Sequence, residues 1–260
     1  MTRLDVWLAE AGLSESREKA QALVMAGRVK LDGQRATKPG TRVRDGAQVE
    51  VDPGPAHVGR GALKLQGALD AFGIDPRGSV AIDVGASTGG FTETLLERGA
   101  SRVYAIDVGR GQLHERLRQD PRVVVRDRTN ARTLSPELVP EPCSLAVMDV
   151  SFISVSKLLE PLRRVLAPGA RALVLVKPQF EVGRRQVGRG GIVRDAGLQL
   201  QALGDVAAFA QAAGYAVRGA CASPITGATG NREFFLHLEP GGEALARGAL
   251  EPLLRRAVSA

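Results

Sequence analysis

The feature that most constrains this chain is the alternation of short apolar runs with amphipathic segments from residue 63 onward. Apolar runs rich in valine and isoleucine predict strands at 80–84, 103–107, 123–126, 145–149 and 173–176. Helical periodicity is found between or before these strands, at 63–72, 91–98, 112–118, 155–166 and 198–213. Strands that alternate with helices usually pair in parallel, so this part predicts a doubly wound, Rossmann-like α/β sheet.

The last two predicted strands, 215–221 and 234–238, follow one another without a helix between them. A connection of that kind predicts a hairpin, so we expect the final strand to run antiparallel to the others. The start of an antiparallel strand lies at the edge where parallel strands end. Polar side chains just before 234–238 are therefore expected to meet those at the carboxyl ends of the other strands. A further helix is predicted over 243–258.

The first 52 residues follow a different pattern and predict a small α+β unit. A short amphipathic helix begins the unit, and Ser16 is placed to cap a second helix that ends at Gly27. Strand-like alternation follows at 29–31 and 43–51. The expected domain division is 1–52 for this unit, 53–60 for a linker rich in proline and glycine, 61–240 for the sheet domain, and 241–260 for a C-terminal helix.

Positive charge gathers in the N-terminal unit. The chain carries 35 lysines and arginines against 28 acidic residues, a net charge of +7. Much of the excess falls on the second helix and the hairpin after it, where the candidate phosphate contacts are Arg17, Lys19, Arg28 and Lys30. An ordinary solvated surface is the alternative, and composition alone does not separate the two.

Composition also excludes several classes of protein. The two cysteines form no CxxC pair and the three histidines are scattered, so we expect neither a disulfide framework nor a bound metal. No apolar run is long enough to span a membrane. The first residues lack the apolar core of a secretory signal. The pattern is typical of a cytoplasmic protein.

A glycine-rich turn follows the first strand of the predicted sheet. Backbone amides in such a turn can approach a ligand closely. Asp107, which ends the next strand, is spaced to accept hydrogen bonds from a ribose diol. The residues expected to bind a cofactor here are Asp83, Gly85, Ser87, Thr88, Gly89, Gly90, Phe91 and Asp107.

Two cofactors that carry an adenosine are compatible with this layout. NAD requires a glycine two positions after the first one, because its pyrophosphate touches the backbone there. Ser87 occupies that position. S-adenosylmethionine has no phosphate, and its cationic sulfonium and amino groups tolerate a nearby acid such as Asp83. The pattern favours S-adenosylmethionine, the alternative being that the glycines only permit a tight turn.

Three charged side chains are expected at the carboxyl edge of the sheet. Asp149 ends the fourth strand, Lys177 ends the fifth, and Glu233 begins the last. Pro178 holds Lys177 in an extended conformation. A lysine at the end of an apolar strand is costly unless it is paired or has a task. A structural salt bridge is one interpretation, and activation of a weak nucleophile such as a ribose hydroxyl is the other.

The N-terminal unit contains short motifs at 3–5, 16–20, 27–29, 31–33 and 38–39. Together they resemble the alpha-L RNA-binding fold. The resemblance implies that the second helix and the loop after it contact RNA.

Six ordered motifs mark the rest of the chain, at 59–65, 83–91, 128–132, 147–154, 177–181 and 230–233. Together they resemble the haemolysin-A-like (TlyA-type) rRNA methyltransferases, whose second domain is a class I methyltransferase similar to the FtsJ/RrmJ group. The resemblance implies a catalytic tetrad of Lys64, Asp149, Lys177 and Glu233, with Lys177 as the base, and further cofactor contacts by Asn130 and Asp149. It also implies S-adenosylmethionine as cofactor, ribosomal RNA or a ribosomal subunit as partner, and a cytidine 2′-hydroxyl as the methyl acceptor.

Two further segments lie near these motifs. The glycine-rich basic segment 183–191 follows Lys177, and we expect Arg184 and Arg185 to contact RNA, a plain flexible loop being the alternative. The family usually has an aromatic-bearing linker that ends in serine before the Lys64 motif, whereas residues 55–59 here include His57 and end in glycine.

Two other functions stay open at this point. A non-catalytic RNA-binding assembly factor is one, against which the complete tetrad argues. A membrane-active haemolysin is the other, against which the lack of a long apolar amphipathic stretch argues. The sequence indicates neither the oligomeric state nor the nucleotide modified.

Overall fold

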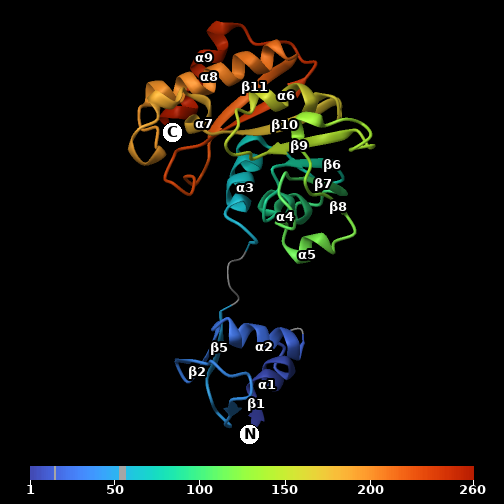
Figure 1. Cartoon of the computed structure of the whole chain (residues 1–260), viewed down its shortest axis with the longest axis vertical. Helices are drawn as coiled ribbons and strands as arrows, with labels where there is room; N and C mark the ends of the chain where they lie inside the picture. The colour runs from blue at the N-terminus through green and yellow to red at the C-terminus, as the bar shows by residue number, and fades with distance from the viewer. Residues whose placement is uncertain (15, 53–56) are drawn as a thin grey trace. The chain divides into compact units, whose positions relative to one another are not determined.

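The computed structural model describes residues 1–14, 16–52 and 57–260, in two compact units, Met1–Ala56 and His57–Ala260 (Figure 1). Part of the expected linker, 53–56, lies outside the described residues. The remainder, from His57 onward, belongs to the second unit, where the backbone amide of Val58 donates to Glu93 at 2.8 Å.

The first unit packs two helices, α1 (Leu4–Glu10) and α2 (Arg17–Met25), around a small apolar core. Ser16 caps α2, as predicted, by accepting a hydrogen bond from the amide of Lys19 at 3.2 Å. The predicted strand over 43–51 was wrong as a single element, because a turn through Gly46 (φ 81°) divides it. The strands are β1 (Thr2–Arg3), β2 (Val29–Leu31), β3 (Gln34–Arg35), β4 (Arg42–Val43) and β5 (Val49–Val51), which pair as β1-β4 and β3-β2-β5.

The second unit is built on a seven-stranded sheet of order β11-β12-β10-β9-β6-β7-β8. Its strands are β6 (Val80–Val84), β7 (Arg102–Ile106), β8 (Val123–Arg126), β9 (Cys143–Met148), β10 (Leu166–Val176), β11 (Tyr215–Ala222) and β12 (Phe234–Pro240). Strands β6 to β10 pair in parallel, whereas β12 runs antiparallel to both of its neighbours. The predicted sheet type and the antiparallel last strand are both confirmed.

Helices cover both faces of this sheet (Figure 1). They are α3 (Gly61–Phe72), α4 (Gly90–Glu97), α5 (Glu115–Arg118), α6 (Ser156–Arg163), α7 (Pro178–Glu181), α8 (Ala196–Ala212) and α9 (Arg247–Ser259). Alternate strand residues point to opposite faces. Ala81 therefore packs with α3 and α4, and Ile82 with α6, α8 and α9, in two separate apolar clusters.

Some predicted boundaries were wrong. The helix expected over 155–166 ends at Arg163, because Leu166 already pairs with Cys143 as the first residue of β10. The helix expected over 112–118 begins only at Glu115, and the one expected over 243–258 begins at Arg247. Local periodicity does not predict where a helix ends when pairing with another strand sets the backbone conformation. No helix within the described ranges is long and apolar enough to cross a membrane.

Candidate active site

A cavity of about 370 Å³ lies beyond the carboxyl ends of β6, β7 and β9. Ligands of open α/β sheets bind at this edge. Its lining includes the predicted cofactor residues Gly85, Ser87, Asp107, Asn130 and Asp149. Residues that the sequence did not single out complete it, namely Val84, Ile106, Val108, Gln112, Thr129, Ala131, Val150, Ser151, Phe152, Ile153 and Leu158.

Asp107 is held in place at this cavity by the backbone. Its two carboxylate oxygens accept hydrogen bonds from the amides of Ser87 at 2.8 Å and Gly109 at 2.7 Å. Each oxygen keeps a further lone pair, so the carboxylate can still accept from a ligand diol. Ser87 itself adopts a left-handed conformation (φ 48°), which turns its amide toward Asp107.

Gly85 permits the close approach of β6 and β9 at the cavity. It has φ 86°, and a Cβ atom there would lie 2.4 Å from the carbonyl oxygen of Asp149. Any side chain at this position would push the Asp149 segment away from the cavity.

Asp83, on β6, is fully buried and does not line the cavity. Its Oδ2 accepts from the hydroxyl of Thr92 at 2.7 Å, whereas Oδ1 has no hydrogen-bond partner in the described chain. Burial, aided by the charges of Asp149 and Asp107, raises the pKa of Asp83 to about 7. A buried carboxylate with an open acceptor position is unusual unless a ligand completes it.

The other predicted cofactor residues serve the packing around the loop. Phe91 is buried and stacks on Phe235, with ring centroids 6.1 Å apart. A Cβ at Gly90 would lie 2.8 Å from the backbone nitrogen of Ala62, so this glycine lets α3 and α4 meet. Thr88 and Gly89 line no part of the cavity described above.

The four tetrad residues come together from four different elements. Lys64 on α3 lies 2.6 Å from Glu233 and 3.6 Å from Asp149, and Lys177 lies 2.5 Å from the other oxygen of Asp149. The charges therefore alternate in a row, Glu233, Lys64, Asp149 and Lys177. Among the described residues no ion pair joins Glu233 directly to Lys177, so Glu233 is linked to Lys177 only through Lys64 and Asp149.

Both lysines are buried, at 8% and 7% exposure for Lys64 and Lys177. The amine of Lys177 also donates to the hydroxyl of Ser151 at 2.9 Å, a contact the sequence analysis missed. Ser151 follows Asp149 by two residues and lines the cavity, so it connects Lys177 to the ligand side. Desolvated charges of both signs next to a cavity are typical of a catalytic centre.

An exposed aromatic residue stands beside this centre. Phe152 is 91% exposed, adopts a left-handed conformation (φ 64°), and lies 5.1 Å from the ring of Phe180. A large side chain in that backbone region is strained, and strain of this kind gathers at functional sites. An exposed ring at the cavity rim offers a surface on which a nucleobase can stack.

Two polar residues that the sequence analysis missed hold the loops of the site, Glu181, which is half-buried, and Asn231. Glu181 accepts from the amide of Val155 at 2.9 Å and so fixes the loop that carries Ser151 and Phe152; burial raises the pKa of Glu181. Asn231, fully buried, accepts from the amide of Val193 at 2.9 Å and donates to the carbonyl of Gly191 at 2.8 Å, and so ties the C-terminal end of the basic segment to the turn before Glu233. Their signal in the sequence was only that each belongs to a motif next to a tetrad residue.

The predicted RNA-binding residues differ in how free they are. Arg184 and Arg185 lie on an exposed 3-10 turn and form no side-chain ion pair or hydrogen bond within the described ranges. In the first unit, Arg17 donates to buried Asp5 at 3.0 Å, so it has a structural task as well. Lys30 forms an exposed ion pair with Glu50 at 3.7 Å. Lys19 and Arg28 also have partners.

Known proteins resemble both units. The model of the FtsJ-like methyltransferase family matches residues 57–239, and that of the S4 domain matches residues 2–49. The chain belongs to the FtsJ-like methyltransferase family. It is a methyltransferase that carries an S4 domain, as the resemblance of its motifs implied.

The proteins similar to this chain include some that cover nearly all of it. It is 48% identical over 260 residues to the 16S/23S rRNA (cytidine-2′-O)-methyltransferase TlyA of Mycobacterium tuberculosis, which covers 99% of this chain and 97% of that protein. It is 39% identical over 236 residues to Hemolysin A of Brachyspira hyodysenteriae, with 90% and 98% covered. A solved structure from Streptococcus thermophilus with a hemolysin designation superimposes with a TM-score of 0.75 at 41% identity, covering 99% and 94%.

Proposed function

We propose that this methyltransferase moves the methyl group of S-adenosylmethionine to the 2′-hydroxyl of a cytidine in ribosomal RNA. The observation that carries the proposal is the buried row of Glu233, Lys64, Asp149 and Lys177 beside a cavity that Asp107 borders. Such a centre suits deprotonation of a poor nucleophile. The cytidine and the ribosomal RNA come from the activity for which the Mycobacterium tuberculosis relative is named.

The residues at the cavity are suited to S-adenosylmethionine. Asp107, in the cavity lining, can accept from a ribose diol. Asp83 does not line the cavity, and in this proposal the ligand's amino group reaches past the lining to its open Oδ1. Neither a lysine nor an arginine lines the cavity in the described chain, which agrees with a cationic ligand without phosphate. When bound, S-adenosylmethionine supplies an electrophilic methyl group on a positively charged sulfur.

In this proposal each tetrad residue has a separate task at the acceptor hydroxyl. In its uncharged form, reached after loss of one ammonium proton, Lys177 takes the proton of the 2′-hydroxyl, while Asp149 and Ser151 orient its amine. Lys64, held by Glu233, positions the ribose. The exposed ring of Phe152 supports a base next to the reacting nucleotide.

We further propose that the two units divide the work at domain level. The S4 unit, residues 1–52, binds RNA, and the sheet domain, residues 61–240, performs the transfer. Arg184 and Arg185 add contacts to the RNA backbone near the site. On this proposal the enzyme acts on ribosomal RNA or a ribosomal subunit in the cytoplasm.

Single-turnover methylation of purified ribosomal subunits and of naked rRNA tests the proposal, with the modified riboses mapped by their resistance to alkaline hydrolysis. We expect transfer to the 2′-oxygen of one or a few cytidines. Transfer to a base nitrogen, or to no RNA at all, would overturn it. Dye release from liposomes, measured in parallel, addresses the hemolysin designation of some relatives. Lysis without methylation would show that the enzyme centre is vestigial.

A further inference from the structure

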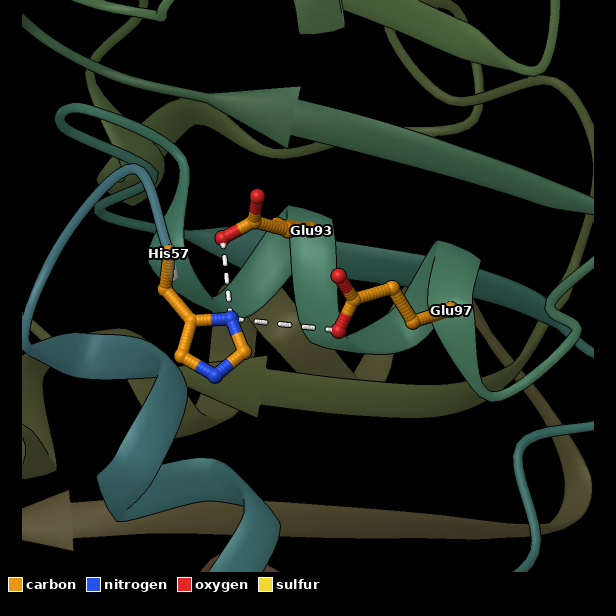
Figure 2. A group of neighbouring side chains, drawn as sticks. All are labelled: His57, Glu93 and Glu97. Atoms are coloured by element: carbon orange, nitrogen blue, oxygen red, sulfur yellow. Dashed lines mark ion pairs between the residues drawn. The ribbon is translucent and has the colours of Figure 1, made fainter. Parts of the chain in front are cut away.

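Outside the active site, three metal-ligating side chains meet at the start of the second unit (Figure 2). His57 lies in the segment that leads into α3, and Glu93 and Glu97 are four residues apart on α4, so they share one helix face. Figure 2 shows the imidazole pointing between the two carboxylates. The sequence analysis expected no metal site because the two cysteines form no CxxC pair and the three histidines are scattered.

The spacing of the three donor atoms matches a metal site. Nδ1 of His57 lies 3.4 Å from Oε2 of Glu93 and 3.9 Å from Oε2 of Glu97, and all three atoms lie within 4.8 Å of one another. Ligands about 2.0–2.2 Å from a tetrahedral zinc ion are about 3.4 Å apart. An ion between these atoms therefore needs only a small inward movement of Glu97, which is half-exposed.

The surroundings of the donors resemble those of metal ligands. Metal-bound carboxylates and imidazoles are themselves hydrogen-bonded by neighbouring groups. Glu93, 2% exposed, accepts from the amide of Val58 at 2.8 Å on the oxygen that faces His57, and its other oxygen pairs with Arg116. Nδ1 of His57 is buried and has no hydrogen-bond partner in the residues described. In the tautomer that carries its proton on Nε2, the lone pair of Nδ1 is available to a cation.

The amide of Gln66 decides which way the imidazole acts. Its nitrogen lies 3.3 Å from Nε2 of His57. When the amide nitrogen of Gln66 faces the ring, Nε2 of His57 accepts its hydrogen bond and Nδ1 carries the ring proton. The proton on Nδ1 then points toward the carboxylates, which gives a simple ion-pair cluster. A half-turn of the amide presents its oxygen, so that Nε2 donates and Nδ1 is left free to bind a metal.

We propose that His57, Glu93 and Glu97 bind one zinc ion or a similar borderline divalent cation, with water completing the coordination. One imidazole and two carboxylates suit zinc and disfavour magnesium and calcium, which prefer oxygen ligands only. The ion fixes the segment at His57 and Val58 onto α4, which begins at the glycine loop of the cofactor site. Its role is structural and separate from the tetrad.

Calorimetric titration of the EDTA-treated full chain with zinc chloride tests the proposal, alongside magnesium chloride. We expect one zinc ion per chain, no binding of magnesium, and at least tenfold weaker zinc binding by His57→Gln and by Glu97→Gln. The matched controls His114→Gln and Glu115→Gln, which are exposed and outside the cluster, should bind zinc like the wild type. Gln66→Ala should weaken binding by about tenfold, the usual effect of losing a group that orients a ligand.

Cobalt provides a spectroscopic measurement that does not depend on affinity. Tetrahedral coordination should give visible d–d bands with the wild type and none with His57→Gln. Equal zinc binding by the wild type and His57→Gln, or no zinc binding at all, would overturn the proposal and leave an ion-pair cluster. Should His57→Gln fail to fold, Glu97→Gln decides by the same criteria, since Glu97 lies at the surface.

Discussion

Asp5 in the first unit and Asp83 in the second are both fully buried, yet their surroundings are opposite. Asp5 accepts hydrogen bonds from Arg3, Arg17, Gln21 and the amide of Val6. The bond from Arg3 is the main cause that holds the pKa of Asp5 well below its usual range. Asp83 has one donor, Thr92, and an oxygen without a partner, and burial raises its pKa to about 7.

The difference distinguishes a buried charge that stabilises the fold from a buried charge that is kept for binding a ligand. A buried carboxylate whose lone pairs are all occupied contributes to folding, and Asp5 joins β1, α1 and α2 in this way. A buried carboxylate with an open acceptor position reduces stability by itself, so it is retained where a ligand completes it. The first unit is therefore complete as it stands, whereas the second has acceptor groups and paired lysines arranged for molecules that bind later.

The largest expected effect concerns Lys177, on the functional side of this contrast. Loss of a general base typically reduces the rate about 10²–10⁴-fold, so Lys177→Ala should lose that much methyl transfer with cofactor and RNA affinity nearly unchanged. Lys177→Arg should be almost as damaging, because arginine does not release its proton near neutral pH. Single-turnover methylation and thermal melts measure both, with Lys157→Ala, an exposed lysine on α6, as control.

Two outcomes at Lys177 would break the contrast. Recovery of most activity with arginine would make this residue an electrostatic anchor and move the base elsewhere. Unfolding of the alanine variant would make the tetrad a structural salt bridge, since partly buried Asp149 would lose its nearest cation.

Asp5→Asn should give the next largest effect, on stability alone. Hydrogen bonds to a charged group contribute about 1.5–3 kcal/mol each, so the first unit should lose at least that much, measured by chemical denaturation. The folded-state pKa of Asp5 is lowered, so its contribution is present above the ordinary aspartate value and is lost as the pH falls below it. Exposed Asp45→Asn is the matched control. Unchanged stability would show that Asp5 is not the junction of the unit.

Asp83 should make the affinity for S-adenosylmethionine depend on pH. Its folded-state pKa is raised, so below about 7 it holds a proton that a cationic ligand must displace. Affinity for S-adenosylmethionine should therefore fall about tenfold for each pH unit below 7. Without ligand, this group should make the free energy of unfolding decrease as the pH rises from about 4 to 7.

Calorimetry of Asp83→Asn from pH 6 to 8 checks this prediction. The variant should bind more weakly at pH 8 and show a nearly flat pH profile, while exposed Asp75→Asn keeps the wild-type profile. A wild-type affinity independent of pH would place Asp83 on the structural side with Asp5.

The smallest expected effect concerns the free arginines of the second unit. Replacing Arg184 and Arg185 by alanine should weaken RNA binding about three- to tenfold and reduce its salt slope by about 1.5, the value for two phosphate contacts. Arg163 and Arg164, an exposed pair on α6, provide the control. An equal loss of RNA affinity in the control variant would show that the effect comes from the net charge and not from specific phosphate contacts. Arg17 is unsuitable for such a test, because its contact with Asp5 mixes binding with stability.

Many helices and strands of this molecule were predictable because residues close together in the sequence determine them. The strand at 80–84 was predicted to the residue, and the cap at Ser16 was also correct, since apolar alternation and capping side chains act within a few residues. The resemblance of the motifs to the family then implied that Lys64 acts together with Asp149, Lys177 and Glu233. Boundaries such as that of α6 and β10 failed where a distant strand decided the backbone conformation.

By itself the sequence determined the order of strands and helices, the S4 and FtsJ-like motifs, and which charged residues stand at the edge of the sheet. Only the tertiary structure decided how those charges pair. It showed Glu233 on Lys64 instead of Lys177, Ser151 on the Lys177 amine, and the open oxygen of Asp83. It also brought His57 to Glu93, 36 positions away in the chain. Pairing and desolvation depend on distances of a few ångströms between residues far apart in sequence, and local patterns carry no information about them.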